Sequence, residues 1–130
     1  IQTKGPSICC VLSTTSCFAP RCPDDILAVA RLCERYNVPH LINNAYGVQS
    51  EPIMKSINSA MEHGRVDCFV QSTDKNFMVP VGGSIVASGQ PNIIKAIAAA
   101  YPGRASAAPI VDLFITLLTM GRNTYRMLLD

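Results

Sequence analysis

Short apolar runs alternate along this chain with segments that have the spacing of amphipathic helices, and this alternation restricts the fold more than any other feature. The apolar runs lie at residues 7–13, 38–43, 67–72 and 84–88. The helical segments begin near four prolines: Pro23, Pro52, Pro91 and Pro109. Strands that alternate with helices predict an α/β fold with a mainly parallel sheet flanked by helices.

Local signals support this order of elements. Asp24 and Asp25 suit the positive end of the first helix. Apolar residues at helical spacing then predict one buried stripe on each of the first two helices, namely Ile26, Val29, Ala30 and Cys33 on the first and Ile53, Ile57, Ala60 and Met61 on the second. Gly64 is the predicted end of the second helix. The turn at Gly82-Gly83 is too short for a crossover helix, so we expect the fourth strand to run antiparallel or to lie elsewhere in the sheet.

Composition restricts the class of protein. Hydrophobic residues make up 48% of the 130 residues and charged residues 15%, which predicts one globular core. A net charge of +2 gives no sign of binding to nucleic acid through charge alone. No apolar stretch approaches about 20 residues and no secretory signal is visible, so we expect a cytoplasmic protein without a membrane span. Because the chain begins at Ile1 and stops within a helical segment, we expect a fragment of a longer polypeptide.

The six cysteines favour a reducing compartment over a disulfide framework. Four of them lie in apolar runs or on an apolar helix stripe, where we expect buried reduced thiols: Cys9, Cys10, Cys33 and Cys68. Cys17 and Cys22 flank a proline-rich loop. No second Cys/His pair completes a zinc set, so no metal site is expected.

Three strand ends carry small and polar residues although the strands themselves are apolar. These ends are residues 13–16, 43–47 and 71–76. In open α/β sheets ligands bind at the carboxyl ends of parallel strands. The sequence therefore predicts one ligand site at this edge of the sheet.

Lys75 is the first candidate within that site. Most lysines are solvated surface groups, but Lys75 follows a buried-type strand directly and precedes the apolar residues 77–80. An amine in an apolar, partly dehydrated pocket loses its proton more easily, and only the free amine attacks an aldehyde. We therefore expect Lys75 to be a Schiff-base lysine in such a pocket.

Other polar residues at the same edge are weaker candidates. Asn43 ends the neighbouring strand, about 4.8 Å away in a parallel sheet, so it could contact the same planar ring, although taken alone it reads as a turn residue. Ser72, or a hydroxyl among residues 14–16 such as that of Thr15, could bind a phosphate or only cap the backbone. Arg104 could grip a phosphate or carboxylate, or lie exposed after a helix.

Longer motifs then resemble a known family. Asn-Asn-Ala-Tyr-Gly at residues 43–47 is similar to the Asp-x-Ala-His/Tyr-Gly signature of fold-type-I pyridoxal 5'-phosphate (PLP) enzymes. Residues 13–21, 40–50, 69–83 and 101–106 resemble, in that order, the O-phosphoseryl-tRNA:selenocysteinyl-tRNA synthase family, also called the soluble liver antigen family. The resemblance covers nearly the whole chain and is far more specific than the short signature.

The resemblance implies a fold, a cofactor and a reaction. The chain would be part of the large PLP-binding domain, and the enzyme would convert phosphoseryl-tRNA(Sec) to selenocysteinyl-tRNA(Sec) with selenophosphate. Lys75 would carry PLP covalently and move the substrate proton, and Asn43 would face the pyridine nitrogen. Tyr46, Ser72 and Thr15 would contact PLP, and Arg104 would hold the phosphate or the selenophosphate.

The resemblance also implies what these 130 residues lack. The phosphate-gripping loop on the N-terminal side and the small C-terminal domain are absent, and a homo-oligomer, a tetramer in this family, completes the active site. Arg65 is a weak candidate for an RNA contact. Asn43 departs from the general signature, which has Asp at this position, but fits this family. A neutral amide supports a protonated ring poorly, so the ring is expected to withdraw electrons less strongly.

Two other readings remain open from the sequence. Another fold-type-I enzyme would fit, such as a decarboxylase, a desulfurase or the related phosphoseryl-tRNA:cysteinyl-tRNA synthase. A desulfurase needs a mobile acceptor thiol, for which Cys17 is conceivable. The second reading is a non-catalytic α/β module, whose nucleotide-binding version is weakened because no glycine-rich phosphate loop is present.

Overall fold

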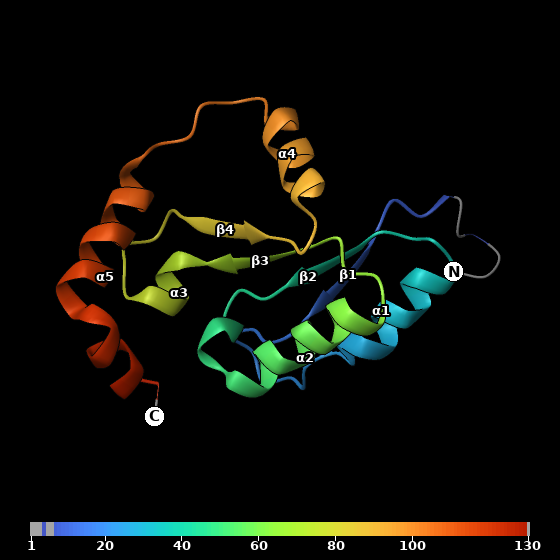
Figure 1. Ribbon diagram of the computed structural model, residues 1–130, viewed down its shortest axis with the longest axis horizontal. Helices are drawn as coiled ribbons and strands as arrows, with labels where there is room; N and C mark the ends of the chain where they lie inside the picture. The colour runs from blue at the N-terminus through green and yellow to red at the C-terminus, as the bar shows by residue number, and fades with distance from the viewer. Residues whose placement is uncertain (1–3, 5–6, 130) are drawn as a thin grey trace.

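A four-stranded sheet and the helices around it form the fold of residue 4 and residues 7–129, which are described in the computed structural model (Figure 1). The elements follow one another as β1 (Val11–Thr14), α1 (Ile26–Arg35), β2 (His40–Asn43), the 3-10 helix η2 (Gly47–Gln49), α2 (Glu51–His63), β3 (Cys68–Ser72), α3 (Thr73–Phe77), β4 (Ser84–Ala87), α4 (Pro91–Ala100) and α5 (Ala108–Met127). The predicted α/β class is confirmed.

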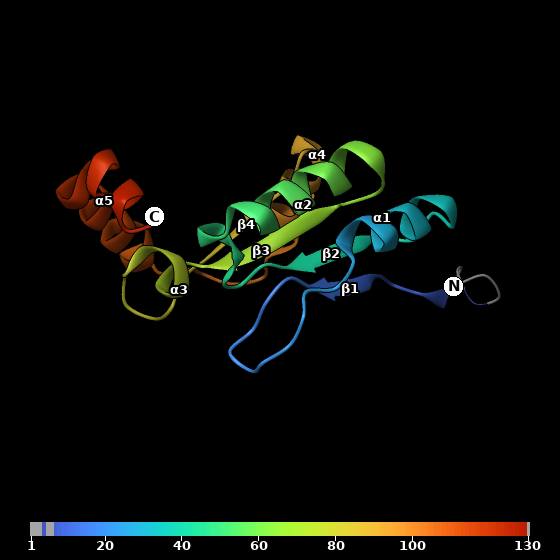
Figure 2. The same cartoon turned by 90° about the horizontal axis from the view of Figure 1, so that it is seen from below.

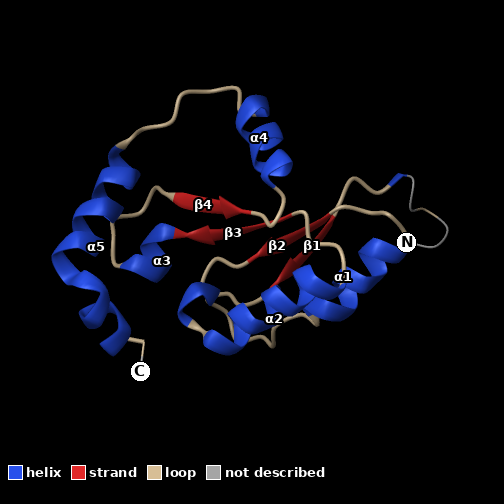
Figure 3. Cartoon of the chain, in the orientation of Figure 1, coloured by secondary structure: helices blue, strands red, loops and turns tan. Residues whose placement is uncertain are grey.

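The strands lie in the order β1-β2-β3-β4 (Figure 3). The first three are parallel, with Thr14 opposite Asn43 and Asn43 opposite Val70. β4 runs antiparallel to β3 and pairs Ser84 with Ser72. The sequence left two possibilities for this strand, antiparallel pairing or another place in the sheet, and the first of them is confirmed. Because β1, β2 and β3 are parallel, their carboxyl ends share one edge of the sheet.

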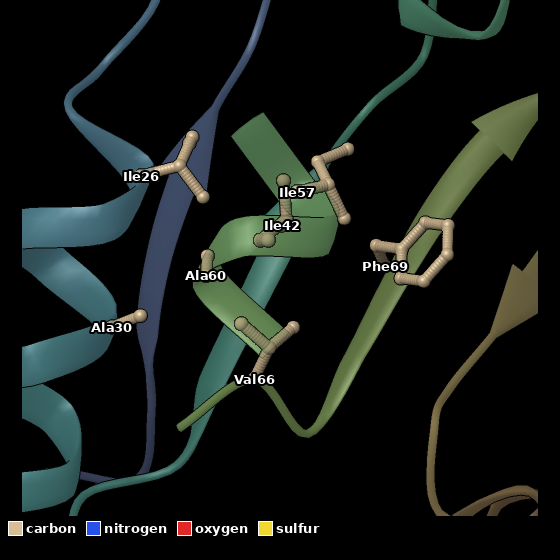
Figure 4. Packing of buried hydrophobic residues seen from close by; sticks show 7 residues of the cluster. All are labelled: Ile26, Ala30, Ile42, Ile57, Ala60, Val66 and Phe69. Atoms are coloured by element: carbon tan, nitrogen blue, oxygen red, sulfur yellow. The ribbon is translucent and has the colours of Figure 1, made fainter. Parts of the chain in front are cut away.

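The core lies between the sheet and the helices α1 and α2, which cover one face side by side (Figure 2). Seven buried apolar residues make up the cluster drawn in Figure 4: Ile26, Ala30, Ile42, Ile57, Ala60, Val66 and Phe69. Ile53 and Met61 pack against this cluster, so the predicted stripe on α2 is confirmed. On α1 the stripe is confirmed through Ile26, Ala30 and Cys33, all buried.

Three of the four helix starts agree with the prolines in the sequence. Pro52, Pro91 and Pro109 each lie in a first helical turn. The prediction for Pro23 is wrong, because the side chain of Asp25 accepts a hydrogen bond from the Ala28 backbone N–H at 3.0 Å and starts α1 at Ile26. An aspartate at this position satisfies an amide that has no partner within the helix.

The first strand is shorter than predicted, and its cysteines differ from expectation. Pairing begins at Val11, whose N–H donates to the carbonyl of Pro39 at 2.8 Å. Pro39 has no N–H to return a hydrogen bond, so the ladder does not extend to earlier residues. Cys9 and Cys10 therefore precede the sheet and are exposed, whereas Cys33 is buried and Cys68 half-buried. The predicted buried thiols are confirmed only at position 33.

Lys75 lies on the short helix α3, which directly follows β3. The side chain of Asn76 donates to the carbonyl of Ser72 at 2.7 Å and thereby closes the turn around Lys75. α3 ends at Phe77, and Met78, which caps it, adopts the left-handed conformation with φ 53°. This helix is what sets the direction of the lysine side chain.

α4 and α5 lie at the margin of the fold, as Figure 1 shows. None of their described residues is buried. α5 starts at Ala108 as predicted but is interrupted at Gly121, where φ is 71° and ψ 165°. Within the part of the chain that the structure describes, no helix combines the length and apolar character needed to cross a membrane.

A buried polar network closes the opposite end of the sheet. The ring of His40 is fully buried, with Nδ1 3.0 Å from the Arg65 carbonyl and Nε2 2.7 Å from the Ser13 hydroxyl. A carbonyl only accepts, so Nδ1 carries the proton and Nε2 accepts from Ser13. Burial lowers the pKa of His40, although the Arg65 carbonyl and the Asp67 carboxylate act in the opposite direction. The fold therefore selects the neutral ring.

We predict that stability falls as the pH drops below 6.5, the ordinary pKa of histidine. Below that pH the unfolded chain takes up a proton that the folded chain excludes, so the contribution of His40 is complete above 6.5 and is lost as the pH falls through the lowered pKa. Denaturant unfolding of the whole polypeptide that carries this chain, compared with its His40→Gln variant, measures the effect. If the free energy of unfolding depends on pH equally in the two proteins, His40 is not the cause of the loss.

Candidate active site

The carboxyl ends of β1, β2 and β3 form one hydrogen-bonded edge. The Thr15 N–H donates to the carbonyl of Asn43 at 3.0 Å, and the Asn44 N–H donates to the carbonyl of Val70 at 2.8 Å. The Ser72 N–H donates to the carbonyl of Ala45 at 3.4 Å. The three polar strand ends in the sequence are thus brought to one edge, and the loop after β2 lies between the other two.

Three electron-rich groups surround the amine of Lys75 at this edge. Its Nζ lies 3.2 Å from Ser72 Oγ, 3.3 Å from Asp74 Oδ2 and 5.6 Å from the centroid of the Tyr46 ring. The side chain is 33% exposed. The prediction of an apolar pocket around Lys75 is therefore wrong for the described residues, because β3 and α3 place the hydroxyl of Ser72 and the carboxylate of Asp74 next to the amine.

Two amide side chains fix α3 against the loop after β2. Gln49 Nε2 donates to the backbone carbonyl of Lys75, and Asn76 Nδ2 donates to the carbonyl of Ala45 at 2.8 Å. α5 adds a third contact, since the Tyr125 hydroxyl donates to the Asn76 carbonyl at 3.2 Å. Burial raises the pKa of Tyr125, which keeps its hydroxyl proton in place. These contacts set the position of Lys75 relative to Tyr46.

The amide of Asn43 has a defined orientation. Its Oδ1 accepts from the Ala45 N–H at 3.1 Å, and the residue is exposed. Because a backbone N–H must meet an acceptor, the oxygen is the atom turned inward and the NH₂ group is turned outward. Asn43 therefore presents a hydrogen-bond donor to any ligand at this edge.

Thr15 lies beneath the edge and not on it. It is 1% exposed, and its hydroxyl lies 2.8 Å from Asn44 Oδ1 and 3.3 Å from the Asn43 carbonyl, both of which are acceptors. Asn44 is fully buried and also donates to Met54 Sδ at 3.5 Å. The single hydroxyl proton of Thr15 is therefore used inside the protein. In this structure Thr15 supports the backbone of Asn43. Its hydroxyl points to Asn43 and Asn44, and not to the surface where the sequence predicted a direct contact with a cofactor.

Ser72 lies on the edge, but its proton is also in use. The hydroxyl donates to Asp74 Oδ1. This contact, with the help of Lys75, keeps the pKa of Asp74 below its usual value. Near the end of β1, Ser16 Oγ is buried without a partner among the described residues. Ser72 can thus meet a phosphate only after it turns away from Asp74.

The two arginines singled out in the sequence lie outside this cluster. Arg104 is exposed in the loop that joins α4 to α5, and no hydrogen bond or ion pair in the described part of the chain ties it to Lys75 (Figure 1). Arg65 donates to both oxygens of Asp67 at 2.8 and 2.9 Å and to Asn37 at 2.7 Å. Arg65 therefore serves the buried end of the sheet, and its guanidinium is occupied by the protein itself.

Four residues of the site escaped the sequence analysis. Asp74 was identifiable from its place next to Lys75, since a carboxylate next to an amine in sequence can form an ion pair with it. Asn76 follows a strand within a polar cluster but resembles a plain cap. Gln49 and Asn44 carry no sequence signal for their contacts, because these depend on how the loop after β2 folds.

Comparison with known proteins places this chain in a family. The family model described as O-phosphoseryl-tRNA(Sec) selenium transferase, SepSecS, matches residues 1–130. The O-phosphoseryl-tRNA(Sec) selenium transferase of Dictyostelium discoideum is 55% identical over 123 residues, which is 95% of this chain and 26% of that protein. The protein of the same name from Leishmania donovani is 60% identical over 119 residues, 91% of this chain and 20% of that protein.

A solved structure agrees with these relatives. The crystal structure of an archaeal O-phosphoseryl-tRNA(Sec) selenium transferase superposes with a TM-score of 0.86 at 45% identity, over 92% of this chain and 27% of that one. The chain thus spans about a quarter of the length of such relatives. With a family model matched from end to end and the same fold in a solved relative, the chain belongs to the O-phosphoseryl-tRNA(Sec) selenium transferase family.

Proposed function

We propose that the polypeptide carrying this chain is a PLP-dependent transferase that converts O-phosphoseryl-tRNA(Sec) to selenocysteinyl-tRNA(Sec) with selenophosphate as the selenium donor. The observation that carries the proposal is the amine of Lys75 at the carboxyl edge of the sheet, beside Ser72 and the ring of Tyr46. Membership of the selenium transferase family supplies the reaction class.

The residues at the edge fit PLP in their chemistry. Lys75 supplies the amine for the aldehyde, and the outward NH₂ of Asn43 supplies a donor for an unprotonated ring nitrogen. Tyr46 supplies an aromatic face and a phenol, and Ser72 supplies a hydroxyl for the phosphate once it leaves Asp74. When bound, PLP supplies an electron sink for negative charge at the substrate α-carbon.

The remaining chemistry is assigned to side chains of this chain. Lys75 Nζ, when it is not covalently engaged, accepts the proton from the substrate α-carbon and returns one to the product. Arg104 binds the phosphate of the substrate or of selenophosphate through its planar, bidentate guanidinium. Since the loop of Arg104 is exposed in this chain, its role requires substrate, or another part of the protein, to bring it to the edge.

The proposal extends to the whole protein. These 130 residues are part of the large catalytic domain, and the N-terminal phosphate loop and a small C-terminal domain come from elsewhere in the polypeptide. The protein acts in the cytoplasm on tRNA(Sec) that carries phosphoserine, and it is a homo-oligomer, a tetramer, whose subunits complete each other's sites. Relatives about four times longer than this chain support the assignment of further parts.

A turnover assay of the full-length protein tests the proposed function. We expect selenocysteinyl-tRNA(Sec) from phosphoseryl-tRNA(Sec) and selenophosphate. We expect much slower reaction with sulfide in place of selenophosphate, and with free phosphoserine in place of the charged tRNA. Preferential use of sulfide would assign the chain to a cysteinyl-tRNA synthase, and turnover of a free amino acid alone would assign it to another PLP enzyme class.

The Asn43→Asp variant tests the ring contact. A carboxylate can keep its hydrogen bond to the Ala45 N–H and would attract a proton to the ring nitrogen, which the amide of Asn43 does not. We expect a shifted visible absorbance of the bound cofactor and more side products, with the fold unchanged. Absorbance spectra and product analysis of the full-length variant measure both. An unchanged spectrum together with an unchanged product profile would contradict the contact.

A further inference from the structure

The carboxylate of Asp74 lies between two donors of the site. Its Oδ1 accepts from the hydroxyl of Ser72, and its Oδ2 lies 3.3 Å from Nζ of Lys75. Its side chain is 15% exposed, less than that of Lys75. The hydrogen bond from Ser72, with that from Lys75, holds the pKa of Asp74 below its usual value. The carboxylate is therefore ionised and held in place at neutral pH.

The surroundings of Lys75 suit an ammonium group and not a free amine. An ammonium has three N–H bonds and no acceptor, and three electron-rich partners surround Nζ: Ser72 Oγ, Asp74 Oδ2 and the ring of Tyr46. A free amine would find no donor for its lone pair among these three groups. The hydroxyl proton of Ser72 already goes to Asp74, and neither the carboxylate nor the ring face has a proton to give.

We infer that Asp74 is a positioning residue for Lys75, whose ammonium it holds at the edge of the sheet in the protein that is free of both cofactor and substrate. This inference rests on the proposed function and extends it, because it assigns a role to Asp74, the residue before the proposed cofactor lysine. The ion pair keeps the side chain beside Tyr46 and stores the proton on Nζ. It also slows reaction of the idle amine with other electrophiles, since only the free amine is a nucleophile.

A labelling experiment tests this inference. Hydroxylamine first removes PLP from the full-length protein, and the lysines are then labelled. Trinitrobenzenesulfonate at one fixed pH near neutrality reacts with free amines only, and peptide mass spectrometry reports the rate at each lysine. In the Asp74→Asn variant we expect Lys75 to be labelled about two to five times faster, because the ion pair at this partly exposed position is lost. Lys55 and Lys95, far from Asp74 in sequence, serve as internal standards.

Two further variants separate this role from a general effect on folding. Asp74→Glu retains the charge, and Lys75 labelling is expected within about twofold of the parent rate. Ser72→Ala removes the hydroxyl that fixes the carboxylate, and a smaller rise than in Asp74→Asn is expected. It also provides the test if the Asn variant does not fold. Unchanged or slower labelling of Lys75 in a folded Asn or Ala variant overturns the inference.

The same measurement is independent of whether PLP is the cofactor. If PLP is never attached to Lys75 while Asp74→Asn still accelerates its labelling, the proposed function fails and the role of Asp74 stands. If PLP attaches to Lys75 and the labelling rate of Lys75 is the same in Asp74→Asn as in the parent, the cofactor assignment stands and the role of Asp74 is lost.

Discussion

The Lys75→Arg variant is expected to lose covalent PLP completely and to turn over its substrate more slowly by a factor on the order of 10³ or more. One side chain is assigned both the covalent link and the movement of the substrate proton, and a guanidinium can do neither because it stays protonated. Its positive charge keeps a partner for Asp74 and an aromatic contact for Tyr46. The fold should therefore be preserved.

Absorbance of the bound cofactor and single-turnover kinetics of the full-length variant measure this loss. Lys95→Arg is the matched control, since Lys95 is exposed on α4, and it should behave like the parent. Turnover by Lys75→Arg within about tenfold of the parent would assign the proton transfer to another residue.

The Gly47→Ala variant is expected to lose about 3 kcal/mol or more of folding free energy, because overpacking and a broken buried hydrogen bond act together. A Cβ at this position would stand 1.9 Å from Asn44 Oδ1 and 2.7 Å from Ile53 Cγ2. Asn44 cannot move aside without giving up its hydrogen bonds with Thr15 and Met54. The loss should therefore extend to the backbone that carries Asn43.

Denaturant unfolding of the whole polypeptide measures the change, with Gly89→Ala as the matched control. A Cβ at Gly89 would meet only Met61 Sδ, at an ordinary 3.8 Å, so that variant should stay within about 1 kcal/mol of the parent. Equal stability of the two variants would show that Asn44 and its loop adapt at little cost.

The order of elements was readable from the sequence because it rests on local signals. The apolar stripes on α1 and α2 and the turn at Gly82-Gly83 depend only on nearby residues. They predicted a mainly parallel sheet and left the fourth strand either antiparallel, as the structure has it, or elsewhere in the sheet. The start of β1 was not readable, because it depends on the lack of an N–H at Pro39, the residue before β2. Pairing partners distant in sequence decide such boundaries.

The site was readable in its location but not in its environment. Lys75, Tyr46 and Ser72 come together because the strand ends they follow share one edge. The prediction of an apolar pocket around Lys75 was wrong, since α3 turns the amine toward Asp74. Thr15 illustrates the same limit, because a hydroxyl at a strand end can point outward to a ligand or inward to Asn44, and only the packing of the next loop decides which.

Borohydride reduction of the full-length protein in the presence of PLP tests the central claim most directly. If Lys75 and Asn43 share one PLP ring, peptide mapping should find the stable pyridoxyl label on Lys75, and a protein with Asn43→Ala should bind the cofactor more weakly at that same lysine. A folded protein that carries no label, or carries it equally on Lys55 and Lys95, would contradict a cofactor site at the carboxyl edge of this sheet.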